Sequence, residues 1–215
     1  MIVKNYIQND FIPLGLEARE DELHLLAKDF KIQHVPIVEE GMLKACWNDE
    51  DYIENTNSKP FFEDLERFFV QENQTLLETF SLFKTYETNC LPILDAKEFY
   101  VGYITMEEVV HQFSLSPVFA ENGIVLLLEK PLIDYSISQI SQLIESNNSR
   151  IYTIGIHRFT QDTAQILVKF TGENIGAVVD SLERFGYRIV YKSTATTKDD
   201  FLNNRYQNLV RFLDF

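Results

Sequence analysis

Two stretches of the sequence resemble each other and decide the fold: HVPIVEEGMLKACWNDEDY at residues 34–52 and CLPILDAKEFYVGYITMEEV at residues 90–109. Each begins with a short apolar run that contains a proline, and Pro36 and Pro92 are 56 residues apart. Asp51 and Glu108, near the two ends, are 57 apart, so the second copy has one extra residue in its turn. A spacing kept over a whole supersecondary unit indicates an internal repeat.

An amphipathic segment with helical spacing precedes each copy. Its apolar positions are Leu23, Leu26, Ala27 and Phe30 before the first copy, and Leu76, Leu77, Phe80 and Phe83 before the second. Asn48 and Thr105 are good N-cap residues, so a helix should begin after the second strand of each copy. A proline is tolerated at the start of a strand or on an edge strand. Each copy therefore reads β-α-β-β-α, with repeats at about residues 1–59 and 60–119.

This duplicated pattern resembles a tandem pair of CBS domains over residues 1–119. The family core reads apolar-Pro-apolar-apolar-Asp and then Gly-x-apolar-Thr/Ser-x-x-Asp. Many members bind adenine nucleotides or S-adenosylmethionine in a cleft between the repeats. A helix N-terminus suits ribose hydroxyls, because a cap side chain, a carboxylate and free N–H groups converge there. The ligand-binding residues that the resemblance implies are Asn48, Asp51, Thr105, Glu108, Pro36, Pro92 and Gly102.

The motifs also depart from the family pattern. Asn48 lacks the hydroxyl, Glu108 is one methylene longer than aspartate, and Ala45 replaces the first glycine. The motifs are flanked by the carboxylates of Asp49, Glu50 and Glu107, which would repel phosphate beside the ligand. Of the candidate ligands AMP, ADP, ATP and S-adenosylmethionine, a neutral or cationic adenosyl compound is therefore favoured over a polyphosphate. The alternative is that Asn48 and Thr105 only cap helices.

A second domain is predicted at residues 120–192, after a linker at Ser116-Pro117. Strands at 123–129, 152–156, 166–170 and 187–191 and helices at 136–144 and from about 174 give a ferredoxin-like β-α-β-β-α-β order. In the second strand, Tyr152, Ile154 and Ile156 are expected to share a face.

This region resembles the ACT domain, which commonly binds amino acids at dimer interfaces. The likeness rests on Pro131 and on Phe185-Gly186-Tyr187-Arg188-Ile189-Val190. Leu132 stands where the family has glycine, so dimerisation is favoured over amino-acid binding. A CBS pair followed by an ACT-like domain resembles the acetoin-utilisation regulator family. Residues 193–215 are predicted to form an amphipathic helix that covers its own chain or a second subunit.

Composition excludes several classes of protein. The net charge is −14, and residues 1–119 hold 22 acidic and 9 basic side chains against 11 and 10 in the remainder. A phosphate-backbone binder needs clustered Lys and Arg, so nucleic acid is not an expected partner. The purest apolar run, residues 124–128, is too short to span a membrane, and no signal peptide is visible. Two cysteines form no disulfide framework, which predicts a cytoplasmic protein with reduced thiols.

The sequence carries no recognisable catalytic motif. The histidines do not cluster, and Glu107, Glu108 and His111 lack a further ligand at metal-binding spacing, so neither an enzyme nor a metal site is predicted. We expect a mixed α/β homodimeric regulator whose CBS-like pair binds an adenosyl-type ligand and alters a protein partner, with the ACT-like domain dimerising or binding a second effector. No other cofactor is expected. The alternative is an interaction scaffold whose ligand motifs have degenerated.

Overall fold

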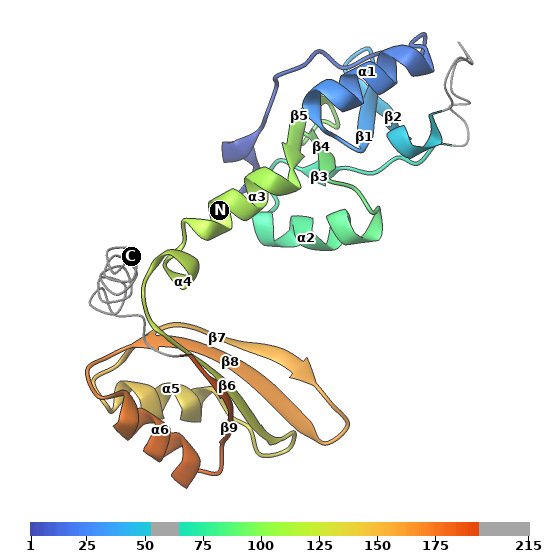
Figure 1. The fold of residues 1–215 in the computed structure, drawn as a ribbon. Coiled ribbons are helices and arrows are strands. Elements are labelled where there is room, and N and C mark those ends of the chain that lie inside the picture. Colours follow the sequence, from blue (N-terminus) through green and yellow to red (C-terminus); the bar gives the residue numbers. More distant parts are fainter. Residues whose placement is uncertain (53–64, 194–215) are drawn as a thin grey trace, which may run out of the picture. The chain divides into compact units, whose positions relative to one another are not determined.

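The computed structural model describes residues 1–52 and 65–193, which fall into two units divided between Phe113 and Ser114 (Figure 1). The predicted C-terminal helix and most of the last helix of the first repeat lie outside the described residues. The elements of the first unit are η1 (Val3–Tyr6), α1 (Glu20–Phe30), β1 (His34–Glu39), β2 (Met42–Asn48), η2 (Asp49–Asp51), β3 (Val70–Gln71), α2 (Leu76–Thr85), β4 (Cys90–Leu94), β5 (Tyr100–Thr105) and α3 (Met106–Ser114).

Strand register shows that the two copies of the repeat are built alike. Ile37 pairs with Ala45 in an antiparallel ladder and forms a parallel bridge with Leu14. Ile93 pairs in the same way with Gly102 and Val70. The residue after each isoleucine interrupts the ladder, as a β-bulge does. The repeat offset seen in the sequence is therefore kept in the three-dimensional structure.

Each repeat is completed by the chain segment that precedes the other repeat. Gln8 pairs with Tyr103 of β5 through two backbone hydrogen bonds of 2.8 and 3.0 Å. The Cys46 amide of β2 donates to the Glu66 carbonyl at 2.8 Å. Since these pairings reach across the sequence, the two repeats fold as one unit with interleaved cores.

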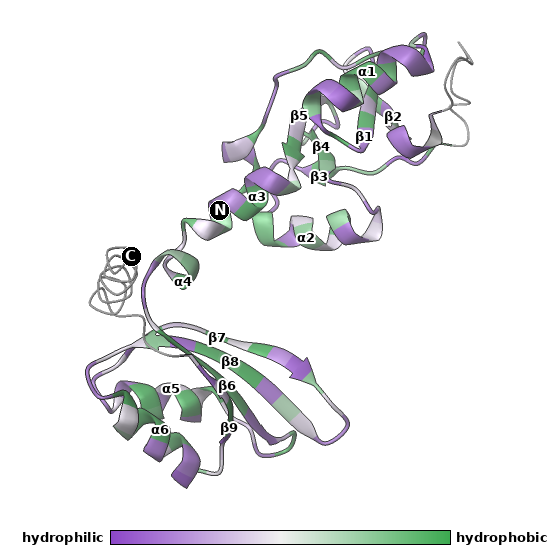
Figure 2. Cartoon of the chain, in the orientation of Figure 1, coloured by the Kyte–Doolittle hydropathy of each residue, from purple (hydrophilic) through white to green (hydrophobic). Residues whose placement is uncertain are grey.

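Three expectations for the helices and strands of this unit need correction. The leading strand of the first repeat is only the bridge at Leu14, and the leading strand of the second repeat has two residues. Leu77 and Phe80 of α2 are 68% and 38% exposed, whereas the buried side of that helix is formed by Leu76, Thr79 and Phe83. Thr79 can be buried because its hydroxyl donates to the Leu76 carbonyl. Figure 2 shows both hydrophilic and hydrophobic residues along α1 and α2.

The second unit has the predicted ferredoxin-like order. Its elements are α4 (Pro117–Ala120), β6 (Ile124–Pro131), α5 (Ile137–Glu145), β7 (Arg150–Phe159), β8 (Thr163–Thr171), α6 (Ile175–Arg184) and β9 (Arg188–Lys192). The sheet order is β7-β8-β6-β9, and all three pairings are antiparallel. Each β-α-β crossover skips one strand, and right-handed crossovers place α5 and α6 on the same face of the sheet (Figure 1). The mixed α/β fold class is confirmed.

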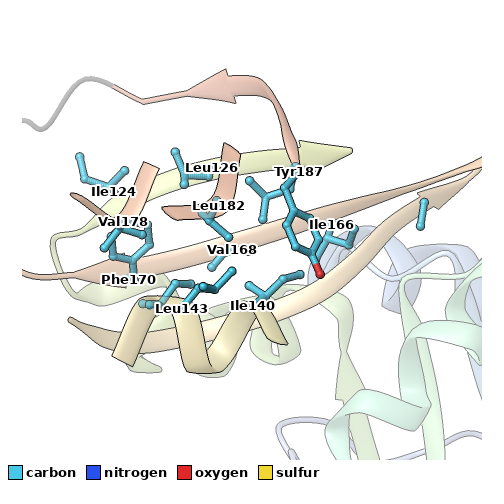
Figure 3. Close-up of a cluster of buried hydrophobic side chains, with 13 residues drawn as sticks. Ile124, Leu126, Ile140, Leu143, Ile166, Val168, Phe170, Val178, Leu182 and Tyr187 are labelled. Carbon is cyan, nitrogen blue, oxygen red and sulfur yellow. The ribbon is translucent and has the colours of Figure 1, made fainter. Parts of the chain in front are cut away.

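The core of this unit lies between the sheet and its two helices. Ile166, Val168 and Phe170 of β8 point toward the helices and are fully buried, as their alternation predicts. Ile140 and Leu143 of α5 meet them from the other side (Figure 3). This packing fixes the face of every strand, because a slip of one residue would expose the apolar set.

Local signals in the second unit fix its helix ends. The Ser136 hydroxyl accepts the Gln139 amide at the start of α5, and Asn174 caps α6 in the same way. Gly186 has φ +79° after α6, which confirms the predicted helix stop.

The strand face predicted for Tyr152 was wrong, because a bulge between Ile151 and Thr153 shifts the alternation. Its ring lies near the Lys169 ammonium group.

Candidate functional site

A cavity of about 490 Å³ opens in the first unit beside the end of β2. Cavities of this size hold small organic ligands in many proteins. Its walls come from the start of β1, the end of β2, η2, the segment before β3 and the C-terminal end of α2. The lining residues are Gln33, His34, Cys46, Asn48, Glu50, Leu65, Glu66, Thr85, Tyr86 and Glu87.

The first sequence motif lies at this cavity. Asn48 lines it, and the Asn48 side-chain oxygen accepts the Glu50 amide at 3.1 Å, so that this residue caps η2. The structure therefore shows Asn48 as a helix cap at the wall of a cavity, and its predicted contact with a ligand stays a prediction. The side chain of Asp51 lies outside the described part of the structure.

Side chains of α1 hold η2 in place. His24 Nδ1 lies 2.7 Å from Asp49 Oδ1, and the His24 ring stacks on Tyr52 with centroids 4.0 Å apart. The Tyr52 hydroxyl donates to Asp21 Oδ1 at 3.0 Å. No sequence pattern predicts this network, because its members are 25 to 31 residues apart and carry no motif. Asp49, which the sequence placed beside the ligand, instead ties η2 to α1.

The charge of the cavity wall is negative. Of the ten lining residues that the structure describes, Glu50, Glu66 and Glu87 carry carboxylates, and none is Lys or Arg. Glu66 and Glu87 were not among the residues predicted from the sequence. They come from the neighbouring repeat, and only its packing against the first repeat brings them here. A phosphate group would meet like charge at this wall, whereas a cation would be attracted.

The side chains of the second motif are engaged by other groups of the protein. The Thr105 hydroxyl accepts the Glu108 amide at 3.2 Å and so caps α3. Glu108 Oε1 accepts a hydrogen bond of 2.8 Å from the side chain of Gln112. The Thr105 amide donates to the Gln8 side chain at 3.1 Å. Neither Thr105 nor Glu108 lines the cavity beside Asn48.

The two prolines and the glycine of the repeat serve strand geometry. Pro36 pairs with Cys46 and Pro92 with Tyr103, both prolines are buried, and neither lines the cavity. Gly102 has φ +140°, and a Cβ there would lie 2.5 Å from the Gln8 carbonyl oxygen. A glycine is required at this position because the N-terminal segment crosses directly over it.

Both cysteines are buried free thiols. Burial raises the pKa of Cys46 to about 12 and raises the pKa of Cys90 as well. A thiol in such surroundings stays protonated near neutral pH, and the thiolate is the reactive form. We therefore expect iodoacetamide at pH 8 to label neither cysteine in the folded protein and both in denaturant. Labelling is followed by mass spectrometry, and rapid modification of the native protein would contradict the burial of these thiols.

Residues 1–52 and 65–193 contain neither a metal-binding cluster nor a membrane-spanning helix. No three His, Cys, Asp or Glu side chains gather there in a way that could hold a metal ion. Across the same residues, every helix is too short or too polar to cross a membrane.

Comparison with known proteins gives the following matches. Residues 60–115 match the family model of the CBS domain. No curated protein matches the chain. Among solved structures, a CBS domain pair/ACT domain protein from Thermotoga maritima is 19% identical, with a TM-score of 0.47, and the match covers 53% of this chain and 96% of that one.

Two further structures were solved with ligands. A CBS domain pair in complex with 5′-methylthioadenosine and S-adenosyl-L-methionine is 21% identical, with a TM-score of 0.44 and coverage of 53% and 96% of the two chains. A protein in complex with AMP is 16% identical, with a TM-score of 0.43 and coverage of 52% and 95%.

The family match falls on the second repeat, so the chain contains a CBS domain at residues 60–115.

Proposed function

We propose that the first unit binds a small adenosyl-type ligand in the cavity beside Asn48 and that the protein is a regulator, not an enzyme. The observation that carries this proposal is the cavity itself, which lies at the first repeat motif in a unit that contains a CBS domain. Its volume of about 490 Å³ is adequate for a nucleoside with a short substituent. CBS domains generally serve regulation and not catalysis, which supports the proposal that the protein is a regulator.

The negative charge of the cavity wall favours some classes of adenosyl ligand over others. Three carboxylates around one cavity disfavour a triphosphate and favour a neutral thioether or a cationic sulfonium. In this proposal Asn48 and Asp51 hold the ribose hydroxyls. Thr105 and Glu108 maintain the second repeat, and the two repeat prolines and Gly102 act through the strands.

The regulatory output requires a partner. We propose that the protein is a homodimer, with the ferredoxin-like unit as an ACT-like module that dimerises or binds a second effector, in an arrangement resembling the acetoin-utilisation regulators. Ligand binding would favour one of two arrangements and so change the affinity for a protein partner. Two free buried thiols are compatible with a reducing compartment, and we place the protein in the cytoplasm.

Calorimetric titration of the full chain tests the ligand class. S-adenosylmethionine and 5′-methylthioadenosine are expected to bind, and ATP to bind at least about tenfold more weakly, which corresponds to about 1.4 kcal/mol. Glu66→Lys should weaken S-adenosylmethionine by about tenfold, because the exposed Glu66 side chain lines the cavity.

The matched control is Glu183→Lys, which makes the same charge change on an exposed residue of α6 in the other unit. It should leave the affinity for S-adenosylmethionine unchanged. If folded protein binds none of the adenosyl compounds, the proposal fails and the scaffold alternative takes its place. Equal weakening by both variants would show a general effect of net charge instead of a site.

A further inference from the structure

The internal repeat allows each wall of the cavity to be compared with its counterpart in the other repeat. Cys46 pairs with Pro36, and Tyr103 pairs with Pro92, so Cys46 and Tyr103 hold the same place in the two ladders. Asn48 and Thr105 are matched by the same register. The helix ends also match, because Lys31 after α1 and Glu87 after α2, 56 residues apart, both have positive φ.

Among the residues that line the cavity, Cys46 stands opposite a much larger counterpart in the other repeat, Tyr103. Cys46 has a small side chain and forms part of the cavity wall. Tyr103 is 3% exposed, and its ring stacks on Phe11 with centroids 4.6 Å apart and planes 27° from parallel. The Tyr103 hydroxyl donates to Asp10 at 3.3 Å. A phenol ring therefore fills space that a thiol leaves open in the first repeat.

The aromatic contacts continue to the far wall of the counterpart. Phe11 lies 5.0 Å from Phe30, the last residue of α1, measured between ring centroids. Phe30 corresponds to Tyr86, which lines the cavity at the end of α2. The first repeat has a similar pair beside its cavity, because Phe68 stacks on Tyr86 with ring centroids 4.4 Å apart. The ring that the second repeat has in addition is Tyr103.

A polar residue, Asn89, also lies at the position in the second repeat that corresponds to the cavity wall. Asn89 corresponds to Gln33 of the cavity wall. The Asn89 side chain accepts the Gln33 amide at 2.8 Å and donates to the Lys31 carbonyl at 2.8 Å. Its hydrogen-bonding groups are committed to protein atoms at the end of α1.

From these contacts we infer that each chain binds one adenosyl-type ligand, in the first repeat, because Tyr103 with Phe11 occupies the counterpart site. This inference rests on the proposed function and adds the number of sites and the residue that sets it. Cys46 and Tyr103 are then the specificity-determining pair of the unit. The smaller side chain leaves a binding site, and the larger one closes it.

The test is the stoichiometry of S-adenosylmethionine binding to the full chain, measured by calorimetry with known active protein concentration. The wild-type chain should bind one equivalent, and Glu66→Lys should weaken it. Tyr103→Cys should raise the count to two. Tyr187→Cys is the matched control, because it removes a buried tyrosine from the other unit and should leave the count at one. Cys46→Tyr should reduce the count to zero in protein that is folded by circular dichroism.

Each outcome separates the inference from the proposed function. Two equivalents in the wild type would overturn the inference and leave the function standing. One equivalent that Thr105→Val weakens and Glu66→Lys does not would place the site in the second repeat and also overturn it. Absence of binding in folded wild-type protein would overturn the proposed function, and the inference with it. If Tyr103→Cys does not fold, the wild-type count and the response to Glu66→Lys decide.

Discussion

Replacing Phe170 with alanine is expected to lower the free energy of unfolding of the second unit by about 3–5 kcal/mol. The Phe170 side chain is fully buried, and its residue pairs with Ile124 on one neighbouring strand and Ile151 on the other. The truncation removes apolar contacts and leaves a void between the sheet and the helices, which a close-packed interior fills only in part.

Denaturant unfolding followed by far-ultraviolet circular dichroism measures the effect of Phe170→Ala. Leu167→Ala is the control, because Leu167 lies on the same strand, points away from the helices and is 38% exposed. Its truncation should cost about 1 kcal/mol. Equal losses for the two variants would contradict the assignment of strand faces.

Gly102→Ala should destabilise the first unit by about 3 kcal/mol, through overpacking and backbone strain together. The new Cβ would meet the Gln8 carbonyl oxygen and the Ile7 side chain, both at 2.5 Å, as well as the Asn9 side chain. A carbonyl in a backbone ladder cannot move aside without breaking the pairing of Gln8 with Tyr103. The φ of +140° adds strain, because side-chain-bearing residues rarely adopt it.

The fluorescence of Trp47 reports this change, because it is the single tryptophan and is buried in the first unit. Gly155→Ala serves as the control, since a Cβ at that strand glycine would meet no atom within 4 Å. Because Gly155 lies in the second unit, its unfolding is followed by far-ultraviolet circular dichroism. Gly155→Ala should change the free energy of unfolding by less than about 0.5 kcal/mol. A Gly102→Ala protein as stable as the wild type would show that the N-terminal segment does not cross β5.

The structure shows where the carboxylates of the acidic first half lie. The sequence predicted that carboxylates beside both motifs would oppose phosphate. Of these residues, Glu50 lines the cavity, while Asp49 contacts His24 and Glu108 accepts from Gln112. Glu66 and Glu87 complete the negative wall from the neighbouring repeat. The expectation about ligand charge therefore has support from partly different residues.

Strand and helix positions could be predicted where the information is local. The 56-residue offset, the alternation in β8 and the caps Ser136 and Asn174 all operate within one element or one turn. Errors arose where a non-local partner decides burial. Leu77 and Phe80 fit a helical stripe, yet the sheet packs against the side of α2 that includes Thr79. Tyr152 fits an alternation that a bulge then shifts.

The sequence by itself determined the repeat, the order of elements in the second unit and the excess of negative charge, because periodicity, caps and composition are properties of short segments. Only the tertiary structure decided which residues surround a cavity and which fill one. Asn48 and Thr105 occupy equivalent places in the sequence motif, but Cys46 leaves space beside the first and Tyr103 fills it beside the second. That difference depends on side-chain volume and on Phe11, a residue from the segment that crosses to the other repeat, and no spacing within the motif encodes it.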